Sequence, residues 1–131
     1  FRAFPRFDLA DWEAVVRHGF PHRDFEGWLA AGDARGRFYD QISRFTRAWS
    51  EGRRGSHWHS ADALAMAMAL APAGVRRAEE RPLAVELEGR LSRAATVVDW
   101  QRRSGRPDNA RILMDYDQAA FEARIRRALG A

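Results

Sequence analysis

The segment from Ala61 to Ala71 constrains the fold more than any other part of the sequence, because nearly all of its residues are small or apolar. Such a run predicts a helix, which Pro72 and Gly74 would end. A helix that is apolar on every side has to be buried between other layers of structure. The only charged residue in the segment is Asp62, which stands close to the predicted N-terminus.

A lone carboxylate among apolar residues costs several kcal/mol to bury unless it is paired or holds a cation. Two explanations therefore fit Asp62. It caps its own helix, which gains about 1 kcal/mol from free backbone N–H groups and the helix dipole. Alternatively, it is a ligand of a hard cation. The residues alone leave both explanations open.

Three helices are predicted upstream of this segment, over residues 8–18, 23–30 and 33–50. Asp8 and Asp33 are the expected N-caps of the first and third. In the first helix the predicted apolar face consists of Leu9, Trp12, Val15 and Val16. In the third helix the spacing i, i+4, i+7 and i+11 predicts a face that packs in the core, made of Phe38, Ile42, Phe45 and Trp49.

The pattern changes to alternation after this segment and predicts three short strands, over residues 83–88, 96–100 and 111–116. Asp117 then caps a final helix that turns Phe121, Ile125 and Leu129 inward. Helices followed by three strands and a terminal helix indicate the α/β class. This order is typical of a portion of a larger α/β protein rather than of a self-contained domain.

Composition excludes several classes of protein. The chain of 131 residues suits one domain, has no cysteine for disulfides or thiolate metal sites, and has no apolar run long enough to span a membrane.

All 22 basic residues are arginine, and the net charge is +4. Because the arginines are interleaved with acids and run no longer than pairs, nucleic-acid binding is not favoured. We expect a soluble, cytoplasmic protein, and the absence of an initial methionine leads us to expect an upstream part.

Several segments resemble one enzyme family. Residues 60–67 (SADALAMA) resemble the aspartate-bearing helix near the C-terminus of inosine/uridine-preferring nucleoside hydrolases. Residues 83–93 (LAVELEGRLSR) and 96–100 (TVVDW) resemble two of its strands, and residues 115–129 resemble its last strand end and terminal helix. The resemblance runs from about Phe38 to the end of the chain. It implies the C-terminal portion of a Rossmann-like nucleoside hydrolase fold, with residues 1–131 as a single partial domain.

The resemblance implies an enzyme that cleaves the N-glycosidic bond of purine and pyrimidine ribonucleosides to ribose and free base. In the family a calcium ion binds the ribose hydroxyls and the attacking water, and clustered N-terminal aspartates supply most of its ligands. The resemblance makes Asp62 a further ligand of that ion. Calcium takes 6–8 oxygen ligands, so one carboxylate is only part of a site.

The aspartate cluster has no counterpart between Phe1 and Asp33. We therefore expect that this chain alone neither binds calcium tightly nor hydrolyses nucleosides. Its expected partners are the nucleoside substrate and either the missing N-terminal portion or further copies of itself.

Candidate catalytic and substrate-binding residues follow from the same resemblance. Many members carry a histidine immediately before the metal aspartate, where this chain has Ala61. His57 and His59 are candidate acids for the leaving base, although both also fit an exposed loop. Trp58 is a candidate for stacking on a purine or for local packing. Phe45 and Trp49 belong to the helix that lends aromatic residues to the base pocket, but their spacing favours core packing.

A second function stays open from the sequence. The chain would then be a non-enzymatic, arginine-rich interaction module that binds an anionic partner. The reading frame upstream of Phe1 separates the two, because clustered aspartates there would favour the hydrolase. A steep salt dependence of RNA binding would favour the interaction module.

Overall fold

The structure is a computed structural model that describes residue 4 and residues 7–131. Its helices are α1 (Trp12–Arg17), α2 (His22–Ala31), α3 (Ala34–Arg54), α4 (Ala61–Leu70), the 3-10 helix η1 (Pro72–Gly74) and α5 (Gln118–Leu129). Its strands are β1 (Asp8–Leu9), β2 (Phe20–Pro21), β3 (His57–Trp58), β4 (Val75–Arg81), β5 (Leu83–Val85), β6 (Thr96–Val98) and β7 (Ala110–Tyr116). The predicted α/β class is confirmed.

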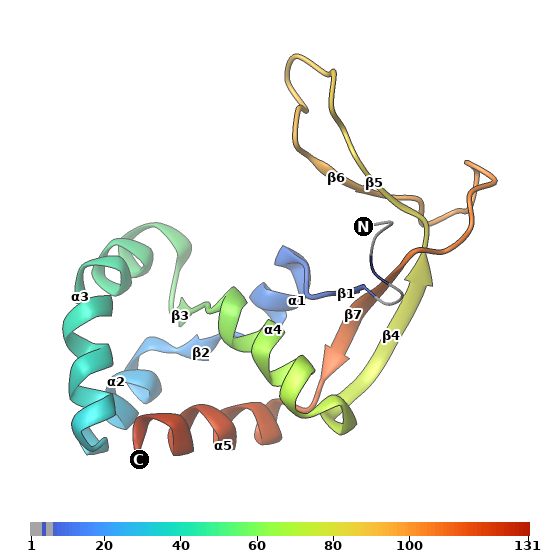
Figure 1. The fold of residues 1–131 in the computed structure, drawn as a ribbon. Helices are drawn as coiled ribbons and strands as arrows, with labels where there is room; N and C mark the ends of the chain where they lie inside the picture. Colours follow the sequence, from blue (N-terminus) through green and yellow to red (C-terminus); the bar gives the residue numbers. More distant parts are fainter. Residues whose placement is uncertain (1–3, 5–6) are drawn as a thin grey trace.

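Helices gather at one end of the molecule and the main sheet lies at the other (Figure 1). In this sheet β7 is central, parallel to β1 and antiparallel to β4. The β5–β6 hairpin projects away from the helices, while α4 and α5 lie between the two ends. Among the described residues, the helices are too short or too polar for any of them to cross a membrane.

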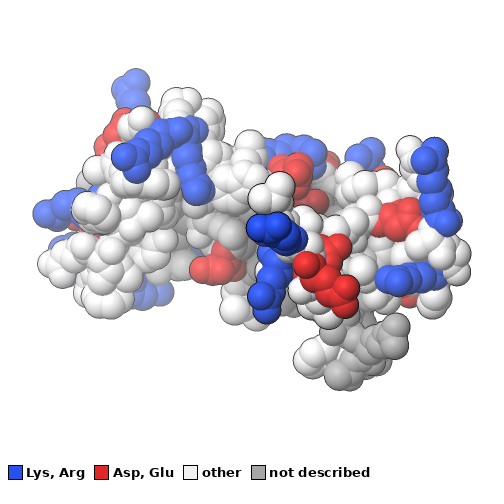
Figure 2. Space-filling view, turned by 90° about the horizontal axis from the view of Figure 1, so that it is seen from above, with Lys and Arg blue, Asp and Glu red and all other residues white. Residues whose placement is uncertain are grey.

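Charged side chains of both signs are interleaved along the face seen in Figure 2. Among the described residues, seven arginines form ion pairs with carboxylates, namely Arg35, Arg44, Arg47, Arg76, Arg81, Arg102 and Arg111. The exposed pairs contribute little to stability, but they break up the positive potential of the surface. No continuous basic field therefore covers this face.

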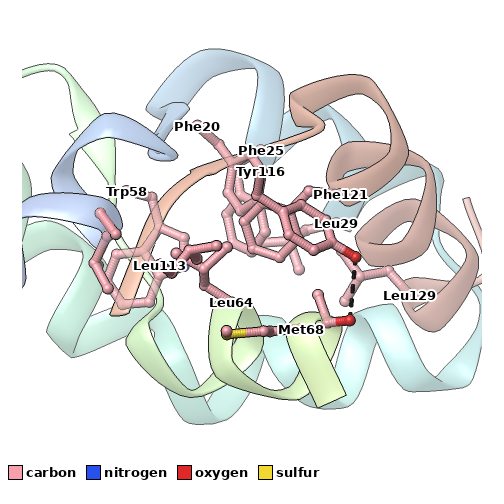
Figure 3. Packing of buried hydrophobic residues seen from close by; sticks show 13 residues of the cluster. Phe20, Phe25, Leu29, Trp58, Leu64, Met68, Leu113, Tyr116, Phe121 and Leu129 are labelled. Carbon is pink, nitrogen blue, oxygen red and sulfur yellow. Dashed lines mark hydrogen bonds between the residues drawn. The ribbon is translucent and has the colours of Figure 1, made fainter. Parts of the chain in front are cut away.

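The main hydrophobic core lies where α4 and α5 meet β7 and the N-terminal helices (Figure 3). Its largest buried side chains are Phe20, Phe25, Trp58, Leu64, Leu113, Tyr116 and Phe121. A smaller cluster of Leu83, Ala110 and Ile112 holds the base of the β5–β6 hairpin against β7. The hairpin beyond this cluster adds few buried contacts, since Leu87 and Leu91 are both exposed.

Tyr116, at the end of β7, connects most elements of the core. Its hydroxyl lies 3.1 Å from the carbonyl oxygen of Ala67 and 2.9 Å from that of Ala71, so it donates to carbonyls at the end of α4 that also accept backbone N–H groups. Its backbone N–H donates to Nε2 of His18 over 3.1 Å. A Cβ at Gly74 would lie 2.4 Å from the Tyr116 ring, so only glycine fits there.

The predicted start of α1 was wrong. Asp8 lies in β1, where Asp8–Leu9 pairs with Arg111–Ile112, and the N-cap is Asp11, which accepts from the Ala14 N–H over 2.9 Å. Val15 is buried as expected, but Trp12 and Val16 are 48% and 47% exposed. Pairing with β7 therefore overrides the helical pattern of the first residues.

The third predicted helix is confirmed with its cap, since Asp33 accepts from the Arg35 N–H over 2.8 Å. Its predicted inner face was wrong. Phe38, Ile42, Phe45 and Trp49 are 62%, 59%, 82% and 41% exposed. The buried face instead carries Gly36, Ser43, Arg47 and Ser50. At Gly36 a Cβ would come within 2.9 Å of the Leu129 carbonyl oxygen, so close packing on α5 selects the small residue.

Arg47 stabilises this polar inner face. Its guanidinium bonds to Asp40, to Glu26 over 3.3 Å and to the Ser43 hydroxyl over 3.1 Å. The side chain is 7% exposed, so these partners offset much of the cost of burying its charge. The inner face of α3 is thus held by specific polar contacts, which a search for apolar periodicity does not detect.

The expectation that α4 is buried on every side was also wrong. Leu64, Ala67 and Met68 face the core, but Met66 and Leu70 are 57% and 69% exposed. With the outer face of α3, this leaves two helices with apolar faces turned to solvent. Large exposed apolar surfaces of this kind mark sites where other structure packs.

All three predicted strands are confirmed as β5, β6 and β7, although β5 and β6 are shorter than predicted. β4 was missed because its sequence, VRRAEER, is mostly charged and has no apolar alternation, yet it pairs along β7. The terminal helix is confirmed: Asp117 accepts from the Ala120 N–H over 3.0 Å, and Phe121 and Leu129 are buried. Ile125 is partly buried beside them.

Replacing Tyr116 by phenylalanine should lower the free energy of unfolding by about 1–2 kcal/mol, because the C-terminal carbonyls of α4 lose a buried donor. Urea denaturation measures this change. Tyr39→Phe is the control, since Tyr39 is only partly buried and its hydroxyl forms no hydrogen bond in the described part of the chain. Equal stability changes in the two variants would contradict the connecting role of the Tyr116 hydroxyl.

Candidate functional site

Asp62 lies in the first turn of α4 and is exposed. The N-cap of the helix is Ser60, and neither residue forms a side-chain hydrogen bond with the free N–H groups of the first turn. Within the described residues, the Asp62 carboxylate has neither a hydrogen bond nor an ion pair. Capping by hydrogen bonds therefore does not account for this carboxylate, and its oxygens are available to a ligand.

The two-stranded sheet β2–β3 brings the histidines to the end of α1. Phe20 pairs with Trp58 and Pro21 with His57, antiparallel. At Gly19 a Cβ would lie 2.9 Å from the ring of His59, so the absence of a side chain lets this imidazole pack against the backbone. The short strand pair thus fixes the segment that leads into α4.

Trp58 points into the core. Its indole is 8% exposed and stacks against Phe25 at a centroid distance of 6.1 Å, with the His22 ring 6.4 Å away. This is the local packing considered from the sequence. Trp58 therefore has no free face for a purine, and its position supports the loop rather than a ligand.

A stack of aromatic and cationic groups joins α1 to the end of α3. The Arg54 guanidinium carbon lies 4.8 Å from the ring centre of Trp12 and 5.3 Å from that of Trp49. The corresponding distance from Arg53 to Trp49 is 5.1 Å. On the other side, the rings of Trp12 and His59 are 5.9 Å apart. We call Trp12, Trp49, Arg53 and Arg54 the indole–guanidinium stack.

The two candidate histidines differ in their surroundings. The rings of His57 and His59 are 6.5 Å apart. His57 is exposed, and its Nδ1 lies 3.1 Å from the Ser56 hydroxyl. Partial burial, and then the charges of His57, Arg54 and His22, hold the pKa of His59 below its usual value. These surroundings disfavour the protonated form that a general acid needs.

The structure brings together only part of the predicted site. His57, His59 and Trp49 border one surface through the stack, and Asp62 follows His59 by three residues. Phe45 lies one helical turn before Trp49 on the exposed face of α3 and is 82% exposed. Trp12 and Arg54 were not predicted as site residues, because Trp12 fitted an apolar helical face and Arg54 was one of many scattered arginines.

The side chains that the structure describes do not form a complete metal site by themselves. The described residues contain no group of three or more His, Asp or Glu side chains arranged to hold an ion. Asp62 offers oxygen atoms, the donor type that calcium prefers. Its unused carboxylate fits one position in a calcium coordination shell, and the remaining ligands would have to come from other parts of a larger fold.

Two concave surfaces lie near the stack. A groove of about 530 Å³ runs between α2 and α3, but its central charges, Arg47, Asp40 and Glu26, pair with one another. A cleft of about 540 Å³ lies between α1 and β6 and includes Trp12 and Trp100 in its lining. Trp12 therefore borders both this cleft and the stack.

Comparison with protein families identifies the chain. The sequence model of the inosine-uridine preferring nucleoside hydrolases matches residues 2–123. The chain belongs to this family. The match extends upstream of the segments on which the resemblance was based, so the helices before Phe38 belong to the same fold. Comparison with curated protein sequences finds no match.

Solved nucleoside hydrolases share the fold of this chain. An inosine-guanosine nucleoside hydrolase superposes with a TM-score of 0.79 at 23% identity, over 93% of this chain and 38% of its own. A purine-preferring ribonucleoside hydrolase from Gardnerella vaginalis gives a TM-score of 0.73 at 16% identity, over 95% of this chain and 40% of its own. The nucleoside hydrolase fold is thus confirmed, and the chain spans well under half the length of these relatives.

The pH dependence of stability tests the environment of His59. Because the pKa of His59 is lower in the folded protein than its ordinary 6.5, the unfolded chain binds this proton first as the pH falls. The associated stability is present above about pH 6.5 and is lost as the pH falls through the folded pKa. His59→Asn should therefore lose less stability than the wild type between about pH 8 and pH 5. Urea unfolding at both pH values measures this, and an equal loss in the two proteins would refute it.

Proposed function

We propose that this nucleoside hydrolase portion contributes one wall of an active site that cleaves the N-glycosidic bond of ribonucleosides to ribose and base. The observation that carries the proposal is the position of Asp62. It is a carboxylate that the fold leaves unpaired, on the helix where the family resemblance requires a metal ligand. The family membership supports the reaction class.

In this proposal Asp62 supplies one oxygen ligand to calcium. A calcium ion held there would activate a water molecule and orient the sugar hydroxyls. The exposed first turn of α4 presents the carboxylate without a competing internal partner in the described part of the chain. The remaining ligands come from the portion of the fold that this chain does not span.

Between the two histidines, we assign the leaving-group acid to His57. Departure of the base from an oxocarbenium-like transition state needs a proton or stacking support. His57 is exposed and holds its Nδ1 beside the Ser56 hydroxyl, whereas partial burial and neighbouring charges lower the pKa of His59 and disfavour its protonated form. Phe45 and Trp49 remain candidates for contact with the base, since both offer exposed rings on α3.

The rest of the fold needs surfaces on which to pack. The outer face of α3, with Phe38 and Ile42, and the outer face of α4, with Met66 and Leu70, are apolar and exposed. Solved relatives are more than twice as long as the aligned chain, which supports these faces as the contacts for the remaining portion. Further copies of this chain are the alternative partner for the same faces.

A chimaera tests the proposal. This chain replaces the corresponding segment of the inosine-guanosine nucleoside hydrolase, and inosine hydrolysis is measured with calcium and with a chelator. We expect calcium-dependent activity, and Asp62→Asn should lower kcat/KM by about 100-fold or more because the ion loses a charged ligand.

The matched control is Asp24→Asn, which removes another exposed aspartate from the first turn of a helix, α2. Its effect on the helix dipole resembles that of Asp62→Asn, so activity should stay within about twofold of the parent. Full activity of the Asp62→Asn chimaera, or equal losses in both variants, would overturn the assignment of Asp62.

A further inference from the structure

Two neighbouring cations in the last turn of α3, Arg53 and Arg54, have no acidic partner. Neither guanidinium forms an ion pair or a hydrogen bond with a carboxylate in the part of the chain that the structure describes. Seven other arginines of this described part are paired with carboxylates. The stack therefore holds two adjacent positive charges whose N–H donors the fold does not use.

The helix dipole alone does not explain this arrangement. Cations are favourable in the last turn of any helix, and α5 has the same feature in Arg126 and Arg127. What distinguishes the α3 pair is the contact of Arg54 with two indoles and of Arg53 with one. Cation–π contacts restrict the guanidiniums without engaging their N–H groups, so the donors are positioned before a ligand arrives.

The size of the charged site selects a small anion. Two adjacent guanidiniums match a single phosphate group, to which arginine donates paired hydrogen bonds. A long polyanion would need an extended basic surface, whereas acids interrupt the basic residues along the face in Figure 2. The chemistry therefore favours one phosphate group over a nucleic-acid strand.

The same stack offers flat aromatic surfaces. The side chains of Trp12 and Trp49 are 48% and 41% exposed, so each indole keeps a part of its surface open to solvent. Exposed indoles bind nucleobases by stacking. We infer that Arg53 and Arg54 bind the phosphate of a nucleoside 5′-monophosphate whose base contacts Trp12 or Trp49. For the nucleoside part of the ligand, this inference rests on the proposed function.

Binding is measured on the complete 131-residue chain by NMR, from the indole Nε1–H and arginine Nε–H signals. The probes are AMP, adenosine, ribose 5-phosphate and inorganic phosphate. AMP should bind about tenfold or more tightly than adenosine, because only AMP engages both guanidiniums. Ribose 5-phosphate and inorganic phosphate should bind more weakly than AMP, because they lack the base.

The variant Arg53→Gln/Arg54→Gln should lower AMP affinity by about tenfold or more, toward that of adenosine. Arg53→Lys/Arg54→Lys keeps the charge but not the planar donors, so an intermediate affinity is expected. The matched control, Arg126→Gln/Arg127→Gln, removes the same charge from the end of α5 and should bind AMP like the wild type. The same spectra report whether each variant is folded.

Equal affinities for AMP and adenosine would overturn the inference. An equal loss of AMP affinity in the Arg53→Gln/Arg54→Gln and Arg126→Gln/Arg127→Gln variants would also overturn it, because it would indicate non-specific attraction of anions. If ribose 5-phosphate binds as tightly as AMP, the indoles do not hold a base and the nucleotide assignment fails. None of these measurements uses hydrolysis or calcium. Their failure therefore leaves the proposed function standing. If the chimaera is inactive, the binding of phosphate by Arg53 and Arg54 is still decided by these measurements alone.

Discussion

The hydroxyl of Tyr116 is the contact on which the arrangement of this chain most depends. Tyr116 ends the central strand β7, and its hydroxyl donates to the carbonyls of Ala67 and Ala71 at the end of α4. Its backbone N–H donates to His18, the C-cap of α1. The other ring nitrogen of His18, Nδ1, lies 2.8 Å from the side-chain oxygen of Gln118, at the start of α5. This pattern fixes the imidazole with its proton on Nδ1. Tyr116 and His18 together therefore set the positions of α1, α4 and α5 around β7.

Some polar side chains of the helices form internal hydrogen bonds or ion pairs, and others do not. Asp11, Asp33 and Asp117 accept backbone N–H bonds at the starts of α1, α3 and α5. Asp62 has the same side chain at the start of α4 and makes no such bond. Arg47 is held by three partners, whereas Arg54 contacts two indoles and pairs with no carboxylate of the described residues. Arg54 and Asp62 stand on either side of the histidine segment in the sequence, which runs from His57 to His59.

The sequence predicted the elements in which local chemistry decides the outcome. The Asp33 and Asp117 caps and the strand at residues 111–116 were recovered, because capping and strand alternation act over a few residues. The sequence did not predict correctly which face of α3 packs against the core. Its apolar stripe predicted a buried face, but a polar network around Arg47 and the close contact at Gly36 determine which side faces inward. Apolar periodicity alone therefore did not show which side of α3 packs against the rest of this chain, and Phe38, Ile42, Phe45 and Trp49 stay exposed.

Some residues of the candidate site could be predicted from the sequence, and others could not. A family pattern could single out Asp62, because a lone acid in an apolar helix is visible in the sequence. Trp12 and Arg54 could not be found, since they meet only when the β2–β3 pair folds residues 20–21 against residues 57–58. Trp58 shows the reverse case: the same pairing turns its indole into the core. The pairing of β2 with β3 therefore decides that Trp12 and Arg54 meet at the surface and that Trp58 is buried.

The central claim is that the fold does not use the Asp62 carboxylate, and the stability of Asp62→Ala tests it most directly. Urea unfolding of the 131-residue chain compares this variant with Asp117→Ala, which removes the carboxylate that accepts the Ala120 N–H. We predict a loss of about 1 kcal/mol for Asp117→Ala and less than about 0.5 kcal/mol for Asp62→Ala, which removes only an interaction with the helix dipole. A loss at Asp62 as large as that at Asp117 would mean that this carboxylate stabilises its own helix, and the ligand role would lose its basis.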